Sequence, residues 1–387
     1  MSITAAMYSG VSGLMANAQG ISVIGNNLAN VNTIGFKSGR MLFSDMISAT
    51  AQNNSQIGRG VQIQKVDNIY AQGAFENTEI VSDIALQGNS FFAFAAPNTT
   101  AGIATQDLAY LSRAGALRVN SSYNLINPDG YLALDAAGGK PILFPNTPVL
   151  AKDTITFGAV TAGQTVIIGD QTYTAGVAGA TAAEVATHFV TNVPTGYTLA
   201  DDGSGDTPPT LGFTLDAGTI DDLTVSGTGA NAQQVQVAKE NAGFFQKITA
   251  IDSQGVITYS DVNGDTYYYN GNGGAVLPAT TINYATALAN GAIAVINPTN
   301  PLGLVKVGGT LFKTSADSGV PTTAFTVGTN RANGSSEKMY SNSLEQSNVD
   351  MAAQFVKMIL TQRAYSANSK TITTSDEMTQ EVLNLKR

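Results

Sequence analysis

The sequence predicts a mainly β protein with α-helical ends, and three observations predict it. Both ends of the 387-residue chain carry apolar residues at three- and four-residue spacing, the stripe of an amphipathic helix. The middle is rich in glycine and in short alternating apolar runs, which is typical of strands and turns. The pattern of these runs changes near residue 149, and the earlier pattern returns near residue 279. We therefore expect terminal helices that form a coiled-coil-like assembly domain, plus two stacked β domains, one inserted in the other.

The first helix is expected from Met1 to about Asn30, with Ser2 as a plausible N-cap. Its apolar residues alternate steps of four and three, and several asparagines then break the pattern. This stripe consists of Met7, Val11, Leu14, Ala18, Ile21 and Leu28.

The second helix is expected from Ser347 to Arg387. Ser347 and Asp350 stand three apart before it, so a hydroxyl and a carboxylate can accept hydrogen bonds from free backbone N–H groups. Its apolar stripe is looser and consists of Met351, Phe355, Met358, Ile359, Tyr365, Ile372, Val382, Leu383 and Leu385. Eleven residues of the two stripes are the candidate polymerisation residues: Met7, Val11, Leu14, Ile21, Leu28, Phe355, Met358, Ile359, Tyr365, Ile372 and Leu383.

Polar and glycine-rich segments divide the chain into four expected parts. These are a helical polymerisation domain (1–31 and 347–387), a connector (32–70 and 335–346), a β domain (71–148 and 279–334) and an inserted outer β domain (149–278). Within the connector, Asn32, Gly35, Gly58 and Gly60 are the candidate hinge residues, because asparagine and glycine tolerate changing backbone angles.

Two local patterns in the expected outer domain point to defined structures. Gly169-Asp170 separates two short β runs and suits a type II′ hairpin turn. Thr181 and Glu184 have the spacing of a capping box and open a short alanine-rich helix.

Composition argues against several classes of function. The chain has no cysteine, so disulfides, thiolate catalysis and cysteine-ligated zinc are excluded. The net charge is −9 without a Lys/Arg cluster, which argues against nucleic acid or an anionic membrane as partner. No charged residue precedes Lys37, and polar residues interrupt every apolar run. We expect neither a cleaved signal peptide nor membrane insertion, so that a dedicated exporter would carry the protein out of the cell.

Candidate catalytic and metal-binding residues are few. The lone His188 lies in the expected short helix with no nucleophile or carboxylate pair at motif spacing, so a structural or surface role is favoured. Asp261 to Asp265 faintly resembles a calcium loop, but the downstream bidentate glutamate is missing and the segment fits a hairpin turn. The sequence predicts no enzyme, no metal and no cofactor.

The terminal helices could be ordinary core helices, but two features of the first favour assembly. Gly10, Gly13, Gly20 and Gly25 each cost about 1 kcal/mol relative to alanine, so this helix needs close packing against neighbours. It also carries no charge on any face, whereas a surface helix normally shows charged residues to water. One other helix of the same chain cannot surround it, so we expect a self-associating subunit.

Several motifs, in the right order, resemble those of the bacterial flagellar rod and hook proteins. Residues 26–37 (NNLANVNTIGFK) are similar to that family's N-terminal signature. Residues 344–350 (LEQSNVD) and 362–370 (QRAYSANSK) are similar to its C-terminal helix. Residues 83–92 (DIALQGNSFF) and 112–116 (SRAGA) resemble the start of its β domain.

The resemblance covers roughly the first 145 and the last 100 residues, where residues 300–304 (NPLGL) resemble a return strand of the β domain. The region from about 149 to 280 shows no comparable motif. Ser90 stands where the family usually has glycine. Chain length and the inserted domain are more similar to hook members of the family than to the shorter rod members.

The resemblance implies a homo-polymer whose subunits stack into a flexible curved tube that joins rod to filament and transmits torque as a universal joint. It implies export by the flagellar type III apparatus, assembly under a hook cap, contact with rod and hook–filament junction proteins, and an extracellular place in the flagellum. It implies no catalysis. We also expect the termini to be disordered or loosely helical in the free monomer and ordered in the polymer.

Two alternatives remain at this point. The chain could be a distal rod or other axial protein of the same family. In a different class, it could be a secreted β-rich adhesin or carbohydrate-binding protein whose helices are incidental, and a glycosidase is more distant because no acid pair stands out.

Overall fold

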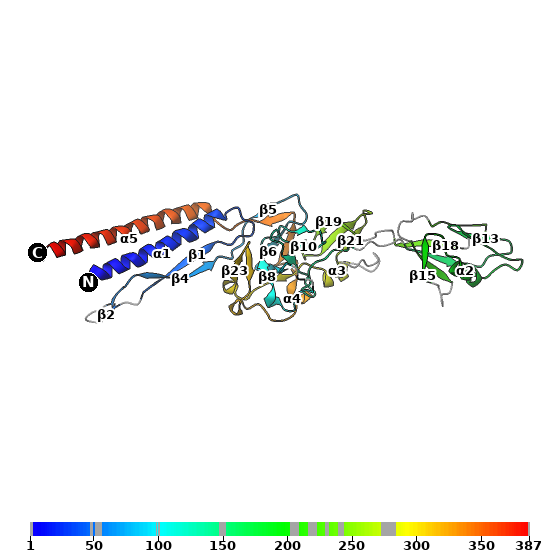
Figure 1. Ribbon diagram of the computed structural model, residues 1–387, viewed down its shortest axis with the longest axis horizontal. Helices are drawn as coiled ribbons and strands as arrows, with labels where there is room; N and C mark the ends of the chain where they lie inside the picture. Colours follow the sequence, from blue (N-terminus) through cyan, green and yellow to red (C-terminus); the bar gives the residue numbers. More distant parts are fainter. Residues whose placement is uncertain are drawn as a thin grey trace.

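The computed structural model describes residues 3–46, 49–50, 56–97, 99, 101–146, 152–201, 209–215, 223–228, 232–238, 244–271 and 284–385. The molecule is elongated (Figure 1). Both chain ends lie together at one end, a central β part follows, and a smaller β part lies at the far end. The prediction of a mainly β fold with helical termini is confirmed.

The two terminal helices are α1 (Ile3–Ala29) and α5 (Met351–Leu385), which pack side by side. Asp350 caps α5, because its Oδ1 accepts a hydrogen bond from the N–H of Ala353 at 3.2 Å. The Ser347 hydroxyl accepts from Val349 before the helix begins, so it does not cap the first turn. Ser2 lies outside the described residues.

A long hairpin lies along α1 where the sequence predicted a connector (Figure 1). Its strands β1 (Gly39–Asp45) and β4 (Val61–Asn68) pair antiparallel, with a register shift between Leu42 and Phe43. Towards its tip, β2 (Ala49–Thr50) pairs with β3 (Gln56–Ile57). The alternation of residues 61–66 predicted β4. The prediction missed β1 and its pairing, so the first stretch of the connector is a hairpin packed on α1.

The central part is built on an eight-stranded antiparallel sheet. Its strands run in the order β23 (Val305–Gly308), β24 (Leu311–Lys313), β8 (Tyr110–Ser112), β7 (Phe91–Ala95), β11 (Leu132–Ala133), β10 (Leu125–Ile126) and β9 (Arg118–Val119), with β22 (Val295–Ile296) also paired to β7.

Smaller elements surround that sheet. They are β5 (Phe75–Asn77), β6 (Ile84–Gln87), β19 (Phe245–Ile251), β20 (Ile257–Asp261), β21 (Thr266–Tyr268), β25 (Lys338–Ser341), β26 (Ser343–Glu345), α3 (Tyr284–Asn290), α4 (Val327–Asn330) and the 3-10 turns η2 (Gln106–Leu108), η3 (Pro301–Gly303) and η4 (Ala316–Ser318). β25 pairs with β6 and β26 with β5, so the second connector segment, 335–346, is also paired strand.

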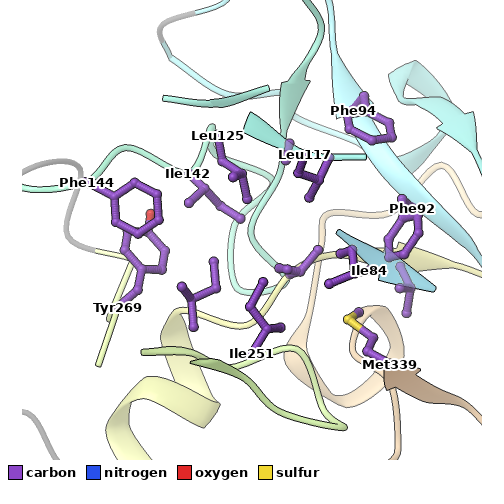
Figure 2. Close-up of a cluster of buried hydrophobic side chains, with 14 of the residues drawn as sticks. Ile84, Phe92, Phe94, Leu117, Leu125, Ile142, Phe144, Ile251, Tyr269 and Met339 are labelled. Atoms are coloured by element: carbon purple, nitrogen blue, oxygen red, sulfur yellow. The ribbon is translucent and has the colours of Figure 1, made fainter. Parts of the chain in front are cut away.

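One core fills the central part and corrects an expected boundary. Ile84 and Phe92 pack with Ile251, Tyr269 and Met339, which come from distant parts of the chain (Figure 2). Strands β19 to β21 therefore belong to the central core, although the sequence placed them in the inserted domain, 149–278. The local sequence pattern of a segment does not show in which core its aromatic side chains are buried. The described residues of the separate outer part run from 152 to 238.

The outer part has its own core around the helix α2 (Ala182–Thr191), whose Phe189 stacks on Phe157. One sheet has the order β15 (Tyr197–Asp201), β16 (Thr210–Leu215), β12 (Lys152–Phe157), β18 (Ala232–Ala238), and the other β14 (Gln171–Thr174), β13 (Thr165–Ile168), β17 (Val225–Ser226).

Both local predictions for the outer part are confirmed. Thr181 and Glu184 form the capping box at the start of α2. Gly169 has φ +57° in the turn that pairs Ile168 with Gln171. His188 lies on α2, with its ring centroid 5.1 Å from that of Tyr173.

Candidate assembly surface and buried joint

Small and polar residues make up most of the seam between α1 and α5. On α1 the buried positions follow each other at three- and four-residue steps, so they share one face of the helix. They are Gly10, Gly13, Ala16, Gly20, Ile24 and Asn27. On α5 the matching positions, buried or half-buried, are Gln354, Met358, Thr361, Asn368, Ile372, Ser375 and Thr379.

Three of the four helix glycines allow this close approach. A Cβ on Gly10 would lie 2.9 Å from Cγ1 of Ile372, and one on Gly13 would lie 2.6 Å from Nδ2 of Asn368. A Cβ on Gly20 would lie 2.9 Å from Cε of Met41, on β1. At Gly25 no described atom lies within 4 Å of such a Cβ. At these three positions the close packing that the glycines were expected to need lies within one subunit.

The large apolar side chains of both helices point elsewhere. Of the candidate polymerisation residues, Val11, Phe355, Ile359, Tyr365 and Leu383 are exposed, and Met7, Leu14, Ile21, Leu28, Met358 and Ile372 are half-buried. Other large apolar side chains on these helices are also exposed: Tyr8, Met15, Met351, Val356, Leu360, Met378, Val382 and Leu385. The stripes and the seam are thus largely different faces, and an apolar surface remains open along the helical pair.

A buried ionic joint fixes the helical pair to the central part. Nζ of Lys37 lies 2.7 Å from Oε1 of Glu345, and Nη1 of Arg113 lies 3.2 Å from Oε2 of the same carboxylate. All three residues are at most 2% exposed. Buried charges are tolerated when they are paired and hydrogen-bonded, and here one carboxylate forms ion pairs with two cations.

Backbone groups complete the joint. Nζ of Lys37 also donates to the carbonyl of Ala71, and Nη1 of Arg113 donates to the carbonyl of Leu86. Oε1 of Glu345 accepts the N–H of Gly73 at 2.9 Å. Burial lowers the pKa of Lys37, and the nearby Glu345 carboxylate partly offsets this effect. Five separate segments of the chain are therefore held at one point.

Two asparagines add further ties beside the joint. Asn27 donates to the carbonyl of Gly39 and to Oε1 of Gln354, and so links α1, β1 and α5. Asn348 accepts the N–H of Ser38 and donates to the carbonyl of Ile69. These residues lie in the motifs at 26–37 and 344–350, which supply much of the contact between the two chain ends.

The candidate hinge residues occupy different environments. Gly35 has φ +67°, and a Cβ there would lie 2.5 Å from the backbone N of Ala114. Gly60 has φ +117°, and a Cβ there would lie 2.1 Å from Oγ of Ser12. Glycine is thus required at both positions for close packing. Asn32 is exposed in the turn after α1, and no described atom lies within 4 Å of a Cβ built on Gly58. The hinge stays a prediction.

In the sequence, Lys37, Arg113 and Glu345 appear only as members of motifs. Lys37 and Arg113 are each the only charged residue of their motif, and Glu345 shares its motif with Asp350, so charge was the available signal. Nothing in the sequence alone showed that the three motifs meet. No described helix is both long enough and apolar enough to cross a membrane.

Comparisons with known proteins agree with this arrangement. The family described as "Flagella basal body rod protein" matches residues 7–37, and the family described as "Flagellar basal body rod FlgEFG protein C-terminal" matches residues 340–385. A flagellar hook protein FlgE of Borreliella burgdorferi is 30% identical over 98% of this chain and 99% of its own length. The chain belongs to the flagellar hook protein family.

Other relatives show how far the likeness extends. The flagellar hook protein FlgE of Salmonella typhimurium is 28% identical to this hook-family chain and covers 97% of it, with 98% of its own length matched. The flagellar basal-body rod protein FlgG of Bacillus subtilis is 26% identical over 98% of both chains. The two family matches cover most of α1 and α5, together with Lys37 and Glu345 of the joint.

Proposed function

We propose that this chain is a structural, non-enzymatic subunit of the bacterial flagellar hook, and that it assembles into a tube through α1 and α5. The observation that carries the proposal is the open apolar surface on these helices. Burial of one large apolar side chain contributes about 1.5 to 3 kcal/mol, so even partial burial of the thirteen exposed ones between subunits would favour assembly.

The buried joint supports torque transmission as part of this function. Because Lys37, Glu345 and Arg113 tie the helices to the central sheet, a force on the helical layer would reach the β parts directly. The β parts would then move as rigid bodies against neighbouring subunits when the tube bends. We propose the division into a helical domain, a central β domain and an outer β domain covering the described residues 152–238.

The family membership supports further proposals about partners and place. We propose that the chain forms a homo-polymer and is exported by the flagellar type III apparatus into the extracellular hook. Rod proteins, the hook cap and the hook–filament junction proteins are the proposed neighbours. The proposal includes neither nucleic acid nor membrane insertion.

Electron microscopy of the purified chain at high salt tests the proposal. The unchanged chain should form tubes. Ile359→Asp with Leu360→Asp should abolish them, because both exposed apolar residues would place charge in a subunit contact. Val177→Asp is the matched control, since Val177 is fully exposed on the outer part and should leave tubes intact. Tubes from a chain truncated before α5 would contradict the proposal.

A rod role is the second candidate, favoured by the match to FlgG over nearly the whole chain. Antibody labelling of isolated flagella would decide between them. Label on the curved segment outside the cell supports the hook role, and label confined to the straight segment below it supports the rod role.

A further inference from the structure

The exposed face of α5 separates its charges by sign along the helix. Basic residues occupy the first part, with Lys357, Arg363 and Lys370 between 351 and 370. Acidic residues occupy the last part, with Asp376, Glu377 and Glu381 between 371 and 385. Neither part contains a charge of the other sign. α1 carries no charged residue at all, so it cannot neutralise either group.

Four of these charges share one line on the helix. Arg363, Lys370 and Glu377 are seven residues apart, and Glu381 follows four residues later. Seven residues make almost two turns, so side chains at this spacing point the same way to within about 20°.

That line lies opposite the seam with α1. Each of the four residues comes two positions after a seam residue: Thr361, Asn368, Ser375 and Thr379. Two residues correspond to about 200° of rotation. All four charged side chains are exposed, and none makes an ion pair with another described residue.

The order of charges does not serve the helix itself. The helix dipole acts only near the ends of α5, where Asp350 caps the N-terminus, so it does not explain the order of these charges. Glu377 and Glu381 are a like-charged pair four residues apart, which costs a few tenths of a kcal/mol in a lone helix. An external partner of opposite sign would relieve this repulsion.

We propose that the partner is α5 of a second copy, docked parallel and displaced along the helix axis. The acidic Glu377 and Glu381 of one copy then lie against the basic Arg363 and Lys370 of the next. The basic and acidic groups are separated by about 11 to 14 residues, which corresponds to an axial displacement of about 16 to 21 Å. The inference rests on the proposed assembly through α1 and α5.

A displaced parallel contact also leaves one acidic and one basic group free for the next copy. Such a head-to-tail contact repeats without closing, whereas an antiparallel contact would pair the same charges but close as a dimer. Exposed apolar residues on the same side, including Val356 and Ile359, supply affinity. The charges set direction and register, because exposed ion pairs add little affinity of their own.

Cysteine cross-linking in assembled tubes tests the displacement directly, and the cysteine-free chain makes it clean. In Arg363→Cys with Glu377→Cys the two sites lie about 21 Å apart on one helix, far beyond disulfide reach, so any bond joins two copies. Oxidation should give a ladder of covalent oligomers. The matched control, Gln362→Cys with Asp376→Cys, has the same spacing on another exposed face and should give no ladder.

Charge reversal provides a second measurement. Arg363→Glu with Lys370→Glu, and separately Glu377→Lys with Glu381→Lys, should each lose tube formation near 0.1 M salt. An equal mixture of the two variants should restore it, because each supplies the charge that the other lacks.

The outcomes separate the two proposals. Wild-type tubes without a ladder, or tubes from either reversed variant alone, overturn the displaced contact and leave the hook function standing. A discrete dimer from Lys370→Cys with Glu377→Cys, without the ladder from residues 363 and 377, would show an antiparallel contact instead. Absence of wild-type tubes contradicts the hook function, and the inference then fails with it.

Discussion

The central core and the helical pair place their apolar residues in opposite ways. In the core, Phe92 and Ile84 are almost completely buried. In the helical pair, small and polar residues make up most of the seam, while Phe355 and Ile359 are about half exposed (49% and 51%). The core is therefore complete within one subunit. The helical pair leaves most of its apolar surface to be covered by something else.

Removal of a large side chain should have the largest effect and should differ most between the two regions. Phe92→Ala should lower the free energy of unfolding by about 3 to 5 kcal/mol, because it leaves a cavity in the core. Phe355→Ala should change monomer stability by less than about 0.5 kcal/mol but reduce tube formation. Urea unfolding followed by tyrosine fluorescence measures the first effect, and pelleting of tubes measures the second. Equal losses of monomer stability would contradict the comparison.

The joint lies where the two regions meet, and a substitution there should have the second-largest effect on stability. Glu345→Gln keeps the shape of the side chain but removes the negative charge that pairs with Lys37 and Arg113. Uncompensated buried charges are strongly destabilising, so we expect a loss of about 3 kcal/mol. Hydrogen exchange should show increased opening at residues 35–38 and 343–348. Glu76→Gln, at an exposed position beside the same strand, is the control and should have little effect.

A larger side chain in the seam should separate α1 from α5. Gly13→Val places a branched side chain where a Cβ already lies 2.6 Å from Nδ2 of Asn368. Overpacking of this kind costs about 1 to 3 kcal/mol. Circular dichroism of the monomer should show earlier melting of helix while the β signal is unchanged. Helix melting identical to that of the unchanged chain would show that the seam does not form in solution.

Gly25→Ala should have the smallest effect and the opposite sign. No described atom lies within 4 Å of the added Cβ, so only the helix propensity changes. Alanine should stabilise α1 by up to about 1 kcal/mol, which a rise in the helix melting temperature would detect. A fall in that temperature would mean that residue 25 already has a close neighbour in the monomer.

Local sequence patterns predicted local structure well. The capping box at Thr181 and the turn at Gly169-Asp170 depend on residues a few positions apart, so the sequence contains the whole interaction. The joint could not be predicted in the same way. Lys37 and Glu345 are 308 residues apart, and only the folded chain shows that their motifs share one buried point.

The assignment of β19 to β21 failed for a related reason. Alternation and turn residues predicted strands there, but Tyr259 and Tyr269 join the central core through contacts with distant segments such as Phe144. The hairpin β1–β4 was half missed because β1 lacks clear alternation and depends on pairing with β4.

By itself the sequence determined the helical ends, the β character of the middle and the resemblance to flagellar axial proteins, because these depend on residue spacing and local propensity. It did not determine which face of each helix is buried. The apolar stripes suggested one face. In the structure mostly glycine and small polar residues form the seam, because they let the two helices approach closely. Much of each apolar stripe therefore stays exposed, which is the physical basis of the proposed assembly.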